Sequence, residues 1–181
     1  MTYPRPTVPP LVLSVDPGAN TAWVRWENGT LHSYGLVHRE DLEAITRLIE
    51  GLTRGLPRDT TGTLVDQPVL VVEDQYLGIL AGNGSKSPKR RKPNPQTYAR
   101  LIECRMRWTV LAELNGWRVV NVLPRVWQSP MHKGAPGKDT KARSMHVATG
   151  IMGQEPPVHD IADAVCIGKH HLGQYDPPAQ G

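Results

Sequence analysis

Five short apolar runs along the chain have the composition of β-strands. They span residues 11–16, 21–27, 30–37, 69–73 and 117–123. The first and fourth runs are almost continuously apolar, which is typical of strands buried on both faces of a sheet. An Asn-Gly pair follows the second run and is a strong signal for a tight hairpin turn. The first three runs therefore predict an antiparallel meander.

Four further segments carry apolar residues at the three- and four-residue spacing of a helix. They are Arg39–Leu52, Gln96–Asn115, Lys141–Thr149 and Asp160–His171. Gly116 follows the second of them, where glycine commonly ends a helix. Its apolar side chains are candidate core residues: Leu101, Ile102, Cys104, Met106, Trp108, Leu111, Ala112 and Leu114. The glycines and prolines of residues 128–139 predict a loop.

The order of these elements, β-β-β-α-β-α-β-α-α, predicts an α/β fold with a mixed five-stranded sheet flanked by helices. This is the order of the ribonuclease H-like arrangement. We expect a single domain over residues 11–172, a flexible lead over residues 1–10 and a flexible tail over residues 173–181. A chain of 181 residues is long enough for one sizeable core.

Composition narrows the possible classes of protein. The sequence contains no run of about 18 apolar residues, so we expect no membrane span. The first residues lack the apolar stretch of a signal peptide. The two cysteines, Cys104 and Cys166, lack the spacing of a zinc site, which favours a reducing cytoplasm. For a phage-encoded chain, this would be the cytoplasm of the host.

Charge is distributed unevenly along the chain. Residues 1–85 carry 6 basic and 10 acidic side chains, residues 86–143 carry 14 and 3, and residues 144–181 carry 1 and 4. The basic middle segment is suited to a polyanion such as nucleic acid. A solvated basic surface with no partner is the plainer interpretation.

Four carboxylates stand where predicted elements begin or end. Asp16 and Glu73 close two apolar strands, while Asp160 and Asp163 lie three apart at the start of the last helix. Carboxylates beside apolar strands are costly to bury without compensation. Two divalent cations provide such compensation, and such metal pairs cleave phosphodiesters.

Each acid also has a simpler explanation. Asp16 precedes Pro-Gly and could begin a turn, and Glu73 could be a solvated residue at a strand end. Asp160 could be only a helix N-cap, and Asp163 only an acid favoured by the helix dipole.

Three motifs together resemble the RuvC family of Holliday junction resolvases, in its phage-type variant. They are Asp16-Pro17-Gly18, Val72-Glu73-Asp74-Gln75-Tyr76 and His159-Asp160-Ile161-Ala162-Asp163-Ala164. The resemblance covers about residues 11–172. It implies a homodimeric endonuclease that nicks opposing strands of a four-way DNA junction, in DNA recombination and repair.

The same resemblance assigns roles to individual residues. Asp16, Glu73, Asp160 and Asp163 would hold two Mg²⁺ ions, for which Mn²⁺ would substitute. Tyr76 would stack at the centre of the junction. Lys141 would assist catalysis, with Lys133 and Lys138 contacting DNA nearby. His159 is placed to touch the metal site or a water.

Residues 82–95 form a longer and more basic insert than the family pattern leads us to expect. Its cations are Lys86, Lys89, Arg90, Arg91 and Lys92. We hypothesise that they grip the junction arms through phosphates, which carry no sequence information. Trp127 stands near a position where bacterial members of the family have another lysine.

Other functions remain open at the level of sequence. The chain could be a broader nuclease for flaps and forks, or the catalytic domain of a transposase. It could also be a non-catalytic junction-binding module or a sugar-kinase-like ATPase. The complete set of four acids argues against the module, and the absence of further glycine-rich phosphate motifs argues against the ATPase.

Overall fold

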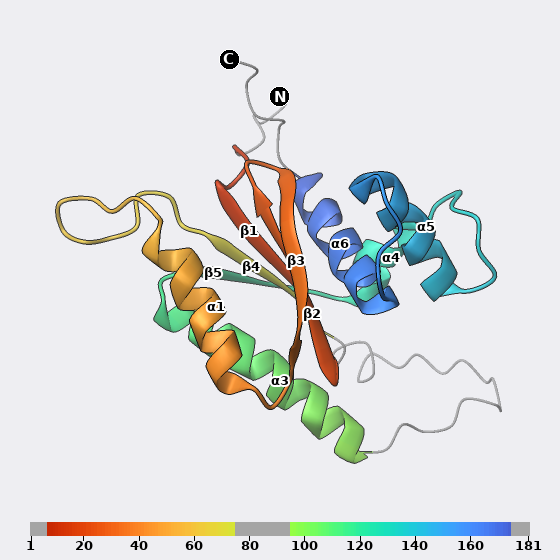
Figure 1. Cartoon of the computed structure of the whole chain (residues 1–181), viewed down its shortest axis with the longest axis horizontal. Coiled ribbons are helices and arrows are strands. Elements are labelled where there is room, and N and C mark those ends of the chain that lie inside the picture. The colour runs from red at the N-terminus through yellow and green to blue at the C-terminus, as the bar shows by residue number, and fades with distance from the viewer. Residues whose placement is uncertain (1–6, 75–94, 175–181) are drawn as a thin grey trace, which may run out of the picture.

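The computed structural model describes residues 7–74 and 95–174, and the side chains from Gln96 onward in the second range. These residues form a five-stranded sheet with helices on both faces (Figure 1). The strands are β1 (Leu11–Asp16), β2 (Asn20–Glu27), β3 (Thr30–His38), β4 (Val69–Glu73) and β5 (Arg118–Val122). The helices are α1 (Leu42–Arg54), α3 (Pro95–Leu114), α4 (Pro124–Met131), α5 (Thr140–Met152) and α6 (His159–Leu172).

The sheet has the strand order β3-β2-β1-β4-β5. Strands β1, β2 and β3 pair antiparallel, whereas β1–β4 and β4–β5 pair parallel. Positive φ angles at Asn28 and Gly29 form the tight turn between β2 and β3. The predicted mixed sheet and its meander are therefore confirmed.

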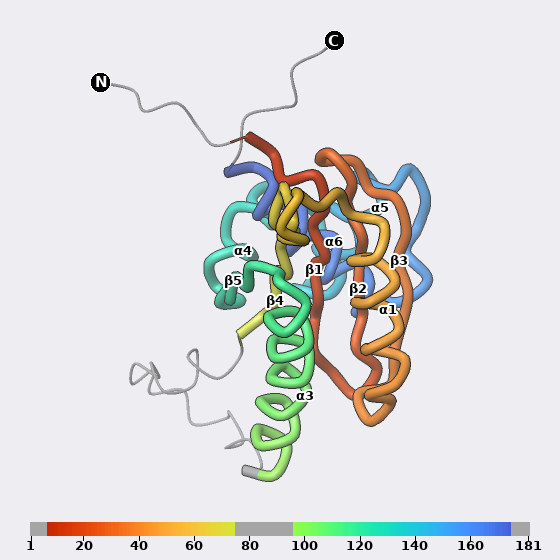
Figure 2. Tube along the Cα trace, turned by 90° about the vertical axis from the view of Figure 1, so that its left-hand side faces the viewer, coloured from red at the N-terminus to blue at the C-terminus, as the bar shows by residue number. Residues whose placement is uncertain are grey.

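The parallel pairing of β1 with β4 brings their carboxyl ends to the same edge of the sheet. Asp16 and Glu73, the last residues of these strands, accordingly lie near one another. The N-terminal half of α3 extends past this edge (Figure 2).

Two apolar cores lie on opposite faces of the sheet. Helices α1 and α3 cover one face and contribute Ile45, Ile49 and Trp108 to its core. Helix α6 lies on the other face, with α4 and α5 packed against it, and Trp26 and Trp127 are buried there. Trp23 packs against the first core and Trp26 lies in the second, because residues three apart on a strand point to opposite faces of the sheet.

Helix α6 approaches the sheet closely at Gly168. A Cβ atom there would lie within 3 Å of side-chain atoms of Trp26 and Ser14. The buried Ser14 hydroxyl accepts a hydrogen bond from Trp26 Nε1 at 2.9 Å and donates one to the Ala164 carbonyl at 2.8 Å. These contacts fix α6 against β1 and β2, so its N-terminal acids are held at the edge that carries Asp16.

Two sequence predictions about secondary structure and packing were wrong. Residues 124–131 form helix α4, so the predicted loop over residues 128–139 is shortened to residues 132–139. Pro124 occupies the first turn of α4, where its missing N–H costs nothing. Met106 and Leu114 of α3 are exposed rather than in the core, because α3 buries only the side that carries Cys104, Trp108 and Ala112.

None of the helices in residues 7–74 and 95–174 is long and apolar enough to span a membrane. Both cysteines, Cys104 and Cys166, are buried free thiols in helices.

Candidate functional site

The four predicted carboxylates meet at the edge where β1 and β4 end. Burial is the largest cause of a pKa of Asp16 raised well above its usual value. The negative charges of Glu73, Asp163 and Asp160 raise it further, in that order, while Lys141 opposes them. Each of the other three acids is therefore close enough to Asp16 to affect its ionisation.

Glu73 is a buried carboxylate, with 5% of its surface exposed. Its Oε2 accepts a hydrogen bond from Trp127 Nε1 at 2.7 Å. A buried carboxylate needs such donors to remain charged. Glu73 is therefore a buried, hydrogen-bonded acid and not a solvated residue at the end of a strand.

Asp160 and Asp163 occupy the first turns of α6. The N-cap of this helix is Val158, so Asp160 is not a capping residue. Burial raises the pKa of Asp163, and a hydrogen bond from Ser144 is the largest effect that lowers it. His159 contributes in the same direction, and Asp160 raises this pKa.

Lys141 is the predicted lysine that lies at this cluster. Its Nζ is 2.8 Å from His159 Nε2, which in turn is 2.8 Å from Asp160 Oδ1. Its positive charge lowers the pKa values of both Asp16 and Asp163. The structure therefore links α5, through Lys141, to the acids on β1 and α6.

Of the other predicted DNA-binding residues, the structure describes Lys133 and Lys138, and neither is among the charges that act on Asp16 or Asp163. Lys133 lines an open hollow between α4 and α5 together with Arg143, and Lys138 lies exposed in the connecting loop. Predicted contacts that fall outside the described residues are Tyr76, Lys86, Lys89, Arg90, Arg91 and Lys92.

The acid cluster suits hard divalent cations in its chemistry. As the side chains stand, no three His, Cys, Asp or Glu groups among the described residues converge tightly enough to hold one ion. Two acids have an oxygen directed to another partner, Glu73 to Trp127 and Asp160 to His159. The donors are nevertheless all carboxylates. Burial first, and then the charges of the neighbouring acids, raise the pKa of Asp16, and a bound cation would oppose both effects.

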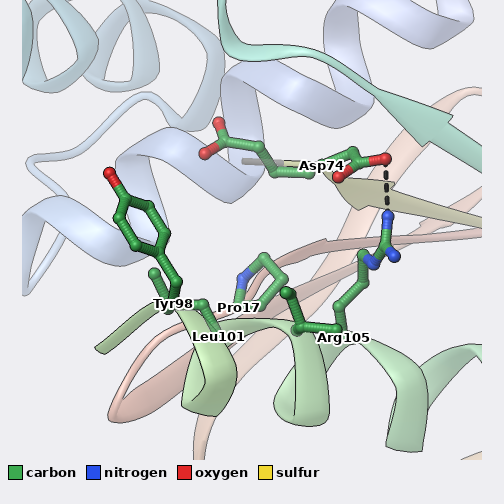
Figure 3. A pocket seen from close by; sticks show the side chains of 7 residues that line it. Pro17, Asp74, Tyr98, Leu101 and Arg105 are labelled. Atoms are coloured by element: carbon green, nitrogen blue, oxygen red, sulfur yellow. Dashed lines mark ion pairs between the residues drawn. The ribbon is translucent and has the colours of Figure 1, made fainter. Parts of the chain in front are cut away.

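An ion pair anchors α3 beside this cluster. Asp74 follows Glu73, is buried, and contacts Arg105 of α3 with 2.5 Å between Oδ2 and the guanidinium. Its backbone N–H also donates to the Val122 carbonyl at 2.8 Å. Figure 3 shows this pair at one end of a small hollow, with Pro17 and Tyr98 lining the same hollow.

Sequence reasoning missed several residues around the acids. Trp127 was noted only for standing near a lysine position, and Ser144, His132 and Arg105 were not singled out. Trp127 and Glu73 are 54 positions apart, so no local spacing signals their hydrogen bond.

No protein-family model matches the chain, and a search of the curated proteins finds no match. Solved structures do match. RuvC of T. thermophilus in complex with a Holliday junction substrate has a TM-score of 0.60 at 18% identity, covering 92% of this chain and 98% of that chain. Another Thermus thermophilus RuvC structure has a TM-score of 0.58 at 19% identity, covering 92% and 99%.

The yeast mitochondrial Holliday junction resolvase Ydc2 gives a TM-score of 0.50 at 13% identity, covering 96% of this chain and 81% of that chain. At these identities the similarity concerns the fold. The chain thus has the ribonuclease H-like fold of RuvC, as its sequence predicts.

Proposed function

We propose that this chain is a Holliday junction resolvase of the RuvC type, a metal-dependent endonuclease that nicks opposing strands of four-way DNA junctions. The observation that carries the proposal is that Asp16, Glu73, Asp160 and Asp163 lie at one edge of the sheet, where the other three acids act on the ionisation of Asp16. The RuvC fold supports it, since one of the solved structures of that fold is a complex with a Holliday junction substrate.

In this proposal the four carboxylates would hold two Mg²⁺ ions, and Mn²⁺ would substitute for them. Bound ions of this kind activate an attacking water and stabilise the leaving oxygen of a phosphodiester. Asp16, placed where the charges of the other three acids act on it, would lie at the centre of the ligand set.

Lys141 supplies a positive charge beside the acids. Its Nζ lies 2.8 Å from His159 Nε2, and its charge acts on both Asp16 and Asp163, although the lysine itself is exposed. A cation at this place would offset the negative charge that develops on a phosphate during cleavage. Lys133, Lys138 and the basic segment 86–92 would contact the backbone of the DNA arms.

We also infer that the chain acts as a homodimer in the cytoplasm. Met106, Val110 and Leu114 are 44%, 43% and 77% exposed and follow one another at four-residue spacing on α3. Such a stripe favours a helix-to-helix contact between two copies. Two-fold symmetry would place two sites on opposing strands of a two-fold junction.

Two buried free thiols are typical of a reducing compartment.

The test compares three labelled DNA substrates of matched sequence: a fixed four-way junction, a flap and a linear duplex. With Mg²⁺ we expect paired nicks in opposing strands of the junction, and no cleavage in EDTA. Equal cleavage of the flap would favour the broader branched-DNA nuclease. Cleavage that survives EDTA would contradict the metal-dependent mechanism.

A further inference from the structure

Two of the proposed metal ligands are held by side chains that would not themselves touch the metal. Trp127 donates its indole N–H to Glu73, and Ser144, which is itself hydrogen-bonded to His132, lowers the pKa of Asp163. Both partners lie on helices that follow β5, on the same face of the sheet as α6. The acids are thus supported from the side of α4 and α5.

The support for Glu73 is rigid. The side chain of Trp127 is fully buried, and its ring is fixed by packing in the core between α4, α6 and the sheet. A glutamate has three side-chain torsions, so its carboxylate is oriented only where a partner holds it. The 2.7 Å bond from the indole to Oε2 provides that restraint.

The support for Asp163 passes through two residues. Ser144 Oγ lies 2.9 Å from His132 Nε2. The Ser144 hydroxyl lowers the pKa of Asp163, which is the effect of a donor on a carboxylate, since a carboxylate only accepts hydrogen bonds. A Ser144 hydroxyl that donates to Asp163 keeps a lone pair free for the His132 ring, and this pairing corresponds to the tautomer with a proton on Nε2.

The two supports meet at the C-terminal end of α4, where His132 is the capping residue. The rings of Trp127 and His132 pack edge to face, with centroids 5.5 Å apart and an angle of 81° between their planes. One packed unit, formed by Trp127, His132 and Ser144, therefore reaches both Glu73 on β4 and Asp163 on α6.

We propose that Trp127, His132 and Ser144 are positioning residues that set the affinity of the site for divalent cations. The proposal rests on the proposed metal-dependent function. Hydrogen-bond partners of metal ligands reduce the cost of ordering those ligands, and their loss typically weakens metal binding about 10–100-fold. Trp127 is then not a replacement for a DNA-contacting lysine but a part of the metal site's frame.

A purely structural role is the competing explanation, and the chain contains a matched control. Trp117 is also buried, with 3% of its surface exposed. Its Nε1 donates to Thr53 Oγ1 at 2.7 Å, the same distance as in the Trp127–Glu73 bond. It belongs to the opposite core, beside α1. Replacing either tryptophan by phenylalanine removes one buried hydrogen bond and keeps an aromatic ring.

The experiment measures Mn²⁺ binding to the full chain by titration calorimetry, and the melting temperature of each variant in EDTA. We expect Trp127→Phe to weaken Mn²⁺ binding at least about 10-fold, while Trp117→Phe stays within about twofold of the wild type. In EDTA, the melting temperatures of both variants should lie below that of the wild type by similar amounts. A Trp127→Phe variant that binds Mn²⁺ like the wild type would overturn the proposal, as would equal weakening by Trp117→Phe.

Ser144→Ala tests the second support and serves if Trp127→Phe does not fold. It removes the hydroxyl and adds no bulk, and it should also weaken Mn²⁺ binding about 10-fold. Unchanged affinity in this variant counts against the proposal. If the wild-type chain binds no Mn²⁺, the proposed metal-dependent function fails and the positioning role fails with it.

Discussion

At the scale of single residues, the structure contains charged groups in places that disfavour their charged forms. Asp16 and Asp163 have raised pKa values because burial removes water from their carboxylates. Near the other end of α6, burial lowers the pKa of His171. Burial opposes ionisation whatever the sign of the charge, so it raises the pKa of an acid and lowers that of a histidine.

His171 makes stability depend on pH. Burial, and then the positive charges of Arg118 and His170, lower its pKa from 6.5 to about 4. Between these values the unfolded chain binds a proton that the native chain does not. The free energy of unfolding that depends on a neutral His171 is therefore fully present above about pH 6.5, and it is lost as the pH falls towards 4.

We expect His171→Gln to reduce the loss of stability between about pH 7 and pH 5 by about 1–2 kcal/mol, since one pKa unit corresponds to about 1.4 kcal/mol. Urea unfolding at the two pH values measures this change. His146→Gln, at an exposed position on α5, is the control. If the two variants show the same pH dependence, burial of His171 does not shift its ionisation.

At the scale of elements, α3 has two different sides. One side packs on the sheet through Cys104, Trp108 and Ala112. Met106, Val110 and Leu114 lie outside that core and are exposed. The helical period of the sequence identified α3 correctly, but apolar residues on both sides left the buried side undetermined. An element with two apolar sides is suited to two contacts, one within the chain and one with a second copy.

We expect Val110→Glu to dissociate the proposed dimer, because it places a charge at the centre of the exposed stripe. Sedimentation equilibrium should give the wild-type chain twice its mass of 20.0 kDa and the variant a single mass. Val65→Glu, at a residue that is 59% exposed outside α3, should remain dimeric. A wild-type monomer at micromolar concentration would contradict the dimer.

At the scale of the whole molecule, most of the fold could be predicted from the sequence. Strands β1 and β4 have unbroken apolar runs, and Asn28-Gly29 marks the hairpin, so the local signals agree with the final structure. Helix α4 was missed because Pro124 reads equally as the end of a strand and as the first residue of a helix.

The acids of the candidate site could also be named from the sequence, because each of them stands near the start or the end of a regular element. Their supporting residues could not. The bond between Trp127 and Glu73 depends on how α4 packs against β4, and a core tryptophan has the same sequence signature whether or not it holds a carboxylate. Lys141 was chosen among three lysines by the resemblance, and the structure places it at the acids.

The central claim is that four carboxylates form one metal-dependent site for cleaving junctions. The most direct measurement is the rate of junction cleavage in Mg²⁺ by Asp16→Asn, with Asp66→Asn, at an exposed position, as the control. The proposal predicts that Asp16→Asn cleaves the junction more than about a hundredfold more slowly than the wild type. Loss of a metal ligand should cost more than loss of a ligand's hydrogen-bond partner, which typically costs about 10–100-fold. It should also melt at a higher temperature in EDTA, because a buried repelling charge is removed. Cleavage by Asp16→Asn within a few-fold of the wild-type rate would contradict the account.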